Sequence, residues 1–377
     1  GMPVEYELMR SINTVAQAER KTIGLVNTDL FIAGGILRTA EGTLPIPRLK
    51  IVNELAKQYN LEIVDAASPL SLWIDNRGDD GQPGDQERKR RYDLLLVAQP
   101  SSLSPEELDN LIAAIQSGQP VLMFEDPFPN PENFRHMAGR GTLWPRFMSR
   151  GGTGTADIQK LWDAIDLDID RVPRGNQSSP WLVWQLPTSN PYTRDPVLSL
   201  PERIIIQESR GDIDPLFSKT HPSTTGISEL YFQYAGYLRK IPNSALDFDF
   251  LVKSGKAGRV VQADFWEANR RYGFFTPQAE AAIQNARGSA ESEFYLGVAI
   301  TGIDHEKALT HELPLSKSNT NVIYVCDVDL LADYFVDIRN NPIQRGIQYE
   351  FQNMSFVLNL VDSMVGESTY LDLRSRK

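Results

Sequence analysis

Residues 92–128 read YDLLLVAQPSSLSPEELDNLIAAIQSGQPVLMFEDPF and decide the fold class. Leu94–Ala98 is a continuous apolar run, which is typical of a strand covered on both faces. Ser104 can cap the following helix and Gly118 can end it. Val121–Phe124 is a second buried strand. Two strands joined by a crossover helix are expected to lie parallel. One face of that helix is apolar: Leu108, Leu111, Ile112 and Ile115.

The rest of the chain repeats this alternation of strands and helices. It predicts an α/β protein with a mainly parallel central sheet flanked by helices. Strands are expected at 21–27, 61–65, 203–207, 246–253, 258–264, 293–301, 321–325 and 370–373. Helices are expected at 46–59, 155–167, 277–287 and 343–365. We divide the chain into a lead-in segment at 1–19, expected to be helical, and a composite α/β domain at 20–377. Excursions at 129–202 and 265–292 are predicted insertions.

Composition narrows the classes of partner. A hydrophobic content of 41% with 23% charged residues is ordinary for a folded protein. The net charge of −11 argues against nucleic acid as a partner. No stretch approaches the ~20 apolar residues of a membrane span. Gly1 before Met2 is typical of a tag-cleavage scar, so we expect an excised piece of a longer protein.

Several candidate catalytic and nucleotide-binding motifs lack residues or neighbouring elements that their chemistry requires. The glycines at 151–154 open a predicted helix, but no strand precedes them as the dinucleotide fingerprint requires. Residues 254–257, SGKA, lack the earlier glycine and the hydroxyl residue of a P-loop. His305 and His311 lie six residues apart, which does not place them on one helix face. Cys326, the single cysteine, excludes an internal disulfide, and we expect it to be buried rather than nucleophilic.

Carboxylates follow three of the predicted core strands. They are Asp65, Glu125 with Asp126, and Asp327 with Asp329. Ligands of open parallel sheets collect at the carboxyl ends of strands, so adjacent carboxylates there could hold a hard cation such as Mg²⁺. The alternative, which we favour, is that these groups cap turns and helix starts. We therefore assign no metal site and keep Asp126, Asp327 and Asp329 as a speculative crevice.

Trp181 and Trp184 flank a short apolar run inside the first excursion. Exposed indoles at that spacing would suit a carbohydrate- or peptide-binding module. Burial in the core or under a loop is the commoner use of tryptophan, and we favour it here.

Three pieces of sequence together resemble a known family. Besides residues 92–128, they are Lys219-Thr220-His221-Pro222 leading into Gly226-Ile227, and the C-terminal segments NVIYVCDVDLLADYF, NMSFVLNLVDSMVGE and YLDLRSRK. The combination is similar to the auxiliary component of gliding-motility-type ABC transport systems, in its extracytoplasmic region. The resemblance implies a fold related to class I glutamine amidotransferases (amidotransferase-like or flavodoxin-like) without their catalytic cysteine. It assigns no catalytic residue, and Asn359, Val361-Asp362 and Gly366, which match the motif of the last long helix, are interpreted as structural.

The resemblance also implies partners. It predicts an ABC permease and ATPase, with membrane helices outside this piece, at the extracytoplasmic (periplasmic) face of the cytoplasmic membrane. We thus expect a non-enzymatic auxiliary domain with a binding or assembly role, no cofactor and an unknown small ligand. The alternatives left open are a metal-assisted enzyme with a carboxylate site at the strand ends, and a carbohydrate- or peptide-binding module.

Overall fold

The structure is a computed structural model of residues 1–377. It describes residues 4–16, 19–39, 42–74, 89–137, 156–169, 171–174, 177–185, 202–208, 214–242, 246–255, 258–262, 294–302, 319–344 and 346–375, and the single positions 191, 192, 194, 195, 198, 200 and 244.

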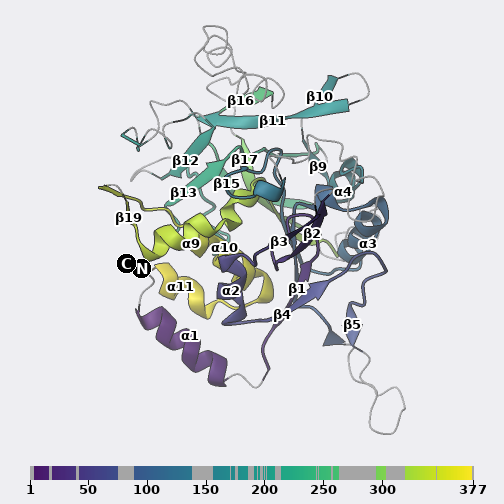
Figure 1. Ribbon diagram of the computed structural model, residues 1–377, viewed down its shortest axis with the longest axis horizontal. Coiled ribbons are helices and arrows are strands. Elements are labelled where there is room, and N and C mark those ends of the chain that lie inside the picture. Colours follow the sequence, from purple (N-terminus) through teal and green to yellow (C-terminus); the bar gives the residue numbers. More distant parts are fainter. Residues whose placement is uncertain are drawn as a thin grey trace.

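A seven-stranded sheet forms the centre of the protein (Figure 1). From one edge to the other its strands are β4 (Asn60–Val64), β1 (Thr22–Val26), β7 (Leu94–Ala98), β8 (Val121–Phe124), β18 (Asn321–Val325), β17 (Tyr295–Thr301) and β15 (Asp247–Lys253). The first five are mutually parallel. β17 runs antiparallel to its neighbour β18, and β15 runs antiparallel to β17. Counted along the chain, the parallel part has the order 2-1-3-4-5, with its switch point between β1 and β7. The predicted mainly parallel α/β sheet is confirmed.

The apolar run of β7 is buried on both faces of this sheet. Leu94, Leu96 and Ala98 belong to one hydrophobic cluster, and Leu95 and Val97 belong to the other. Side chains alternate between the faces of a strand, so a strand with helices on both sides needs apolar residues at every position. This is why the run shows no polar alternation.

Helices and a small sheet cover the two faces. One face packs against α2 (Lys50–Ala56), α9 (Asp333–Asn340), α10 (Asn353–Val365) and the antiparallel pair β12 (Arg203–Gln207) and β13 (Glu229–Gln233). The other face packs against α3 (Pro105–Gln116) and α4 (Gln159–Ala164). The protein is therefore layered, with buried clusters on either side of the sheet.

The crossover helix α3 begins as its sequence predicts. Ser104 Oγ accepts from the Glu107 backbone N–H at 3.3 Å, and the Glu107 carboxylate accepts from the Ser104 N–H at 2.8 Å. The helix is followed by Gly118, whose φ of +87° is in the left-handed region.

The excursion at 129–202 contributes small strands outside the central sheet. β10 (Arg171–Arg174), β11 (Gln177–Gln185) and β16 (Gly258–Gln262) form a three-stranded antiparallel sheet, and β9 (Leu167–Asp168) pairs with β14 (Arg239–Lys240). The predicted helix at 155–167 is shorter than expected, since the described helix is α4. Strand 203–207 exists, but it pairs with β13 rather than joining the main sheet. The excursion at 265–292, including the helix predicted at 277–287, lies outside the described residues.

Near the N-terminus, two antiparallel hairpins lie outside the main sheet. They are formed by β2 (Gly35–Thr39) with β3 (Gly42–Ile46), and by β5 (Trp73–Ile74) with β6 (Lys89–Arg90). The helix expected at 46–59 is shorter in the structure: Ile46 belongs to β3, and α2 begins at Lys50 and ends at Ala56.

Two expectations near the C-terminus were wrong. Residues 343–352 do not extend the last long helix: β19 (Ile343–Gln344) and β20 (Ile347–Gln348) form a hairpin, and α10 starts at Asn353. Gly346 has a φ of +77° in the connecting turn, which favours glycine and breaks a helix. The strand expected at 370–373 is the helix α11 (Thr369–Ser375), which buries Tyr370, Leu371 and Arg374 at helical spacing.

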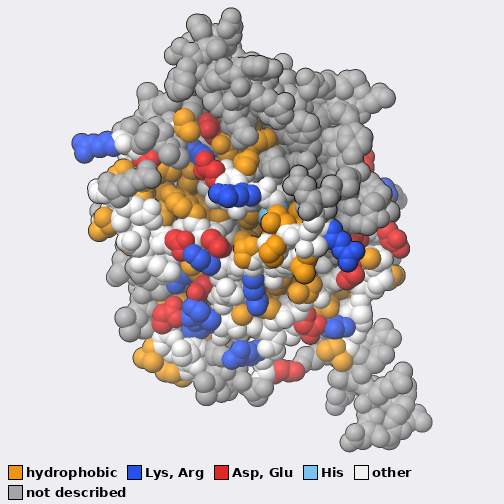
Figure 2. All heavy atoms as spheres, viewed as in Figure 1, with side chains coloured by type: hydrophobic (Ala, Val, Ile, Leu, Met, Phe, Trp, Pro, Cys, Tyr) orange, Lys and Arg blue, Asp and Glu red, His pale blue; other side chains and the backbone are white. Residues whose placement is uncertain are grey.

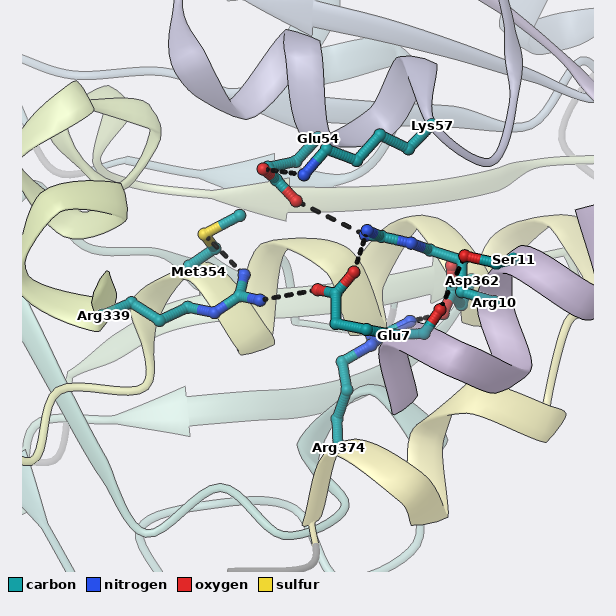
Figure 3. Close-up of polar contacts among 9 residues, drawn as sticks. All are labelled: Glu7, Arg10, Ser11, Glu54, Lys57, Arg339, Met354, Asp362 and Arg374. Carbon is teal, nitrogen blue, oxygen red and sulfur yellow. Dashed lines mark hydrogen bonds and ion pairs between the residues drawn. The ribbon is translucent and has the colours of Figure 1, made fainter. Parts of the chain in front are cut away.

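The lead-in segment forms the helix α1 (Val4–Ala16), which packs on the domain (Figure 1). Tyr6 is 1% exposed and meets the Tyr370 ring edge-on. Arg10 bonds Glu7 and reaches Glu54 of α2 at 3.4 Å, and Arg339 of α9 reaches Glu7 at 3.7 Å (Figure 3). Figure 2 shows acidic and basic side chains next to one another on this part of the surface. Within the described residues, no helix combines the length and the apolar character needed to cross a membrane.

Candidate functional site

The carboxyl ends of β8 and β18 bring three aspartates together. The two strands are parallel neighbours with Phe124 opposite Val325, so Asp126 and Asp327 follow at matching positions. Carboxylate oxygens of Asp126, Asp327 and Asp329 all lie within 4.8 Å of one another. All three residues are 0% exposed. We call these three residues the carboxylate cluster.

Hydrogen bonds from the surrounding loops hold the carboxylate cluster. Asp327 accepts from the backbone N–H groups of Gln233 and Asp329, both at 2.6 Å. Asp329 accepts from the Asn133 amide at 2.8 Å and from the Asn130 backbone N–H at 3.0 Å. These bonds fasten β13 and the 130–133 loop over the end of the sheet.

Asp126 belongs to the same arrangement. Its carboxylate accepts from the Phe128 backbone N–H at 2.7 Å, closing a turn at the end of β8. Asp327 likewise caps the 3₁₀ turn at Val328–Leu331. The turn expected at Asp126 is therefore present, whereas the cap expected at Asp329 is provided by Asp327 instead. These capping groups also form the cluster of carboxylates that was the less favoured interpretation of the sequence.

Burial and mutual repulsion make these groups hard to ionise. Burial, followed by the charges of Asp327 and Asp329, raises the pKa of Asp126 well above its usual range. Burial and the charge of Asp329 do the same to the pKa of Asp327. Burial raises the pKa of Asp329 to about 6, although the Asn133 and Asn130 hydrogen bonds oppose the shift. The cluster therefore holds protons at a pH where exposed aspartates are ionised.

The other strand-end carboxylates lie elsewhere. Glu125 faces β7, where its carboxylate accepts from the Ser101 backbone N–H at 2.9 Å and the Ser101 hydroxyl at 2.6 Å, and bonds the Gln99 amide. Gln99 is fully buried with a φ of +62°, so this bonding holds a strained backbone after β7. Asp65 follows the edge strand β4 and is exposed. Neither residue joins the carboxylate cluster.

Other candidates from the sequence have structural positions. Cys326 is 3% exposed, and burial raises the pKa of its thiol, which suits a core residue and not a nucleophile. Trp184 is 2% exposed and offers no stacking surface. The side chain of Trp181, residues 151–154, His305 and His311 lie outside the described part of the chain.

A polar pocket adjoins the carboxylate cluster, and sequence reasoning missed it. Its volume is about 190 Å³, and Arg203 of β12, Tyr231 and Gln233 of β13 and Asn133 line it. Gln233 and Asn133 are the residues that also bond the cluster. Nothing in the local pattern marks Arg203, since it is the first residue of an apolar strand. A second pocket of about 260 Å³ lies at the end of β1 and is also lined by Ile63 of the edge strand β4.

The sequence matches a known protein family over most of its length. Residues 20–360 match the family described as "ABC-type uncharacterized transport system". The chain belongs to this family. None of the curated proteins matches the sequence.

Two solved structures are similar to this family member. One is the N-terminal domain of mmIFT52, with 8% identity and a TM-score of 0.42 over 91% of this chain and 97% of that chain. The other is a putative ThuA-like protein from Bacteroides uniformis, with 10% identity and a TM-score of 0.38 over 92% of this chain and 91% of that chain.

In this ABC transport family member, the motif residues of α10 have packing roles. The Asn359 amide donates to the backbone oxygens of Ser223 and Thr225 at 3.2 and 3.3 Å. Asp362, fully buried, bonds Arg374 of α11 and the Tyr59 hydroxyl. Gly366 has a φ of +79° and ends the helix. The motif thus joins α10 to its neighbours, as the structural interpretation expected.

Proposed function

We propose that this chain is a non-enzymatic, extracytoplasmic auxiliary domain of an ABC-type transport complex, where it acts by binding or assembly. Membership of the ABC transport family over residues 20–360 supports the setting. The partners that we propose are an ABC permease and an ATPase, which would supply membrane passage and nucleotide hydrolysis. We also propose that the transport system is of the gliding-motility type and that the fold is related to that of glutamine amidotransferases.

The observation that carries the non-enzymatic role is the state of the carboxylate cluster. General acid–base catalysis requires a side chain within hydrogen-bond reach of a substrate. Asp327 and Asp329 are 0% exposed; Asp327 accepts from Gln233 of β13 and from the turn that it caps, and Asp329 accepts twice from the 130–133 loop. Their chemistry is used to hold those loops in place, which suits a rigid binding or docking domain.

Copurification tests the partners. The full-length protein, affinity-tagged and produced at native level in its source organism, is extracted in mild detergent. We expect the permease and ATPase of one ABC system to elute with it in fixed ratio. Elution free of both subunits, while both are present in the same extract, would reject the proposed assembly.

Labelling tests the location. Glu106 of α3 is exposed, whereas the native Cys326 is buried. Glu106→Cys therefore introduces an accessible thiol, and the native thiol is not expected to react. A membrane-impermeant maleimide should label Glu106→Cys on intact cells whose outer barrier has been removed. Labelling that requires lysis would place the domain in the cytoplasm and overturn this part of the proposal.

A metal-assisted enzyme remains the second candidate because three carboxylates converge within 4.8 Å. It predicts that Mg²⁺ or Ca²⁺ raises the melting temperature, and that Asp327→Ala and Asp329→Ala abolish the rise. The non-enzymatic proposal predicts no rise with either ion at millimolar concentration. The two candidates are thus separated by one thermal titration.

A further inference from the structure

The pocket beside the carboxylate cluster combines a buried cation with aromatic walls. Its residues come from several segments, among them β12, β13, α9 and β19, which lie near one another in Figure 1. Tyr231, Tyr334 and Tyr349 supply rings, and Gln233 and Gln344 supply amides. A volume of about 190 Å³ is below the roughly 300–1,000 Å³ of pockets for drug-sized ligands, so it suits a molecule of one ring or one amino-acid unit.

Arg203 is the basic residue of this lining. Its side chain is 5% exposed, and its guanidinium lies 5.1 Å from the centre of the Tyr234 ring. Burial disfavours its charged form, but the Glu202 carboxylate and the hydrogen bond to the Tyr231 hydroxyl keep its pKa above the usual value. The pocket therefore contains a permanent positive charge. The buried Asp195 also lines it, where its carboxylate accepts from the Tyr349 hydroxyl at 2.6 Å and the Leu198 N–H at 3.1 Å.

The donors of Arg203 are incompletely used. Nη1 donates to the Tyr231 hydroxyl at 3.2 Å and to the Gln233 side-chain oxygen. Nη2 reaches Glu132 at 3.7 Å, and Glu132 is 76% exposed at the rim, so water screens that ion pair. Among the described residues, Nε has no hydrogen-bond partner. A buried guanidinium with this much unused capacity favours an added acceptor of negative charge.

The base of the pocket is rigid. The Gln233 side-chain oxygen also accepts from the Asn130 amide at 2.6 Å, while the Gln233 backbone N–H bonds Asp327. Asn133 bonds Asp329. The side chains around Arg203 are thus fixed by the carboxylate cluster at the end of the sheet, and a ligand meets a site that is already formed.

We propose that this pocket binds the carboxylate group of a small polar molecule, with Arg203 as the anion receptor and Glu132 as a rim group that competes for it. A planar guanidinium matches a carboxylate in shape and charge. The tyrosine rings and the Gln233 and Gln344 amides then contact the body of the ligand. This inference adds a ligand to the proposed binding role, and its failure would leave the copurification result unaffected.

Two matched pairs of probes test the chemistry and separate its sources. D-glucuronate with D-glucose represents a sugar acid, and N-acetyl-L-alanine with its amide represents the end of a peptide. Isothermal titration should give, for at least one pair, an acid that binds ten-fold or more tightly than its neutral partner. Equal affinity within both pairs, or no binding of either acid at millimolar concentration, would overturn the proposal.

Variants assign the effect to the pocket. Glu132→Gln removes the competing rim carboxylate from an exposed position, and we expect the acid to bind several-fold more tightly. Glu106→Gln makes the same charge change on α3, across the sheet, and should leave affinity unchanged. Arg203→Lys keeps the charge but loses the planar guanidinium that can bond both carboxylate oxygens, and we expect affinity to fall ten-fold or more. Unchanged affinity in both Glu132→Gln and a folded Arg203→Lys would contradict the assignment.

Discussion

Asp126, Asp327 and Asp329 show what burial does to a single residue type. Each would ionise near pH 4 in an unfolded chain. In the fold they occupy one space closed to water, so the neutral form is favoured. The sequence placed them at strand ends, which follows from the apolar runs before them. Their distances depended on β8 and β18 being neighbours, which no local pattern encodes.

The raised pKa values predict a pH dependence of stability. The folded state keeps protons that the unfolded state releases above about pH 4, so stability falls as pH rises through the folded pKa, which is about 6 for Asp329 and higher for Asp126 and Asp327. Asp126→Asn removes one proton site while keeping an oxygen for the Phe128 N–H. Between pH 5 and 7 its free energy of unfolding should rise relative to wild type by on the order of 1 kcal/mol per pH unit.

Urea unfolding of both proteins at pH 5, 6 and 7 measures this difference. Carboxylates outside the cluster contribute equally to the two curves, so the difference isolates the cluster. Parallel curves for wild type and Asp126→Asn would show that the pKa of Asp126 is not raised by folding.

Elements with complete local signals formed as the sequence predicts. The helix α3 has a capping serine, an acidic first turn and a terminal glycine, all within its own stretch. The segment at 343–365 has an apolar pattern but a glycine turn inside it, and that turn divided it into a hairpin and α10. Segment 370–373 was too short for its period to be recognised; it lies in α11, which contacts α10 through the hydrogen bond from Arg374 to Asn359.

The capping box of α3 allows a prediction at this scale. Ser104→Ala removes the acceptor for the Glu107 N–H, and we expect the free energy of unfolding to fall by about 1 kcal/mol. Ser104→Gly, which frees the backbone N–H groups to water, should cost only a few tenths of a kcal/mol. Chemical unfolding distinguishes the two, and an equal loss in both variants would argue that the cap is not the source.

At the scale of the whole molecule, the lead-in helix is part of the packed structure. Its Tyr6 lies against Tyr370 and 5.1 Å from the Arg374 guanidinium, and Arg10 joins it to α2 (Figure 3). Through Arg374 the same contacts reach Asp362 in α10. The predicted division at residue 19 therefore separates a segment whose side chains pack within the domain.

Tyr6→Ala should release α1. The change removes a buried aromatic side chain, so we expect a loss of about 3 kcal/mol, with amides of 4–16 losing hydrogen-exchange protection while those of β7 and β8 keep theirs. Leu8→Ala, on the exposed side of the same helix, should change stability by less than about 0.5 kcal/mol. Retained protection of 4–16 in Tyr6→Ala would show that α1 is held by other contacts.

The sequence by itself determined the α/β class, the strands of the parallel sheet, the crossover helix and the family, because these depend on apolar runs, caps and motifs within short stretches. Tertiary structure decided which strand ends are adjacent, and so united Asp126 with Asp327 and Asp329 while leaving Asp65 at the edge. It also placed Arg203 beside Tyr231 and Gln233 in a pocket. Those neighbours are distant along the chain, and burial and hydrogen bonding act through space.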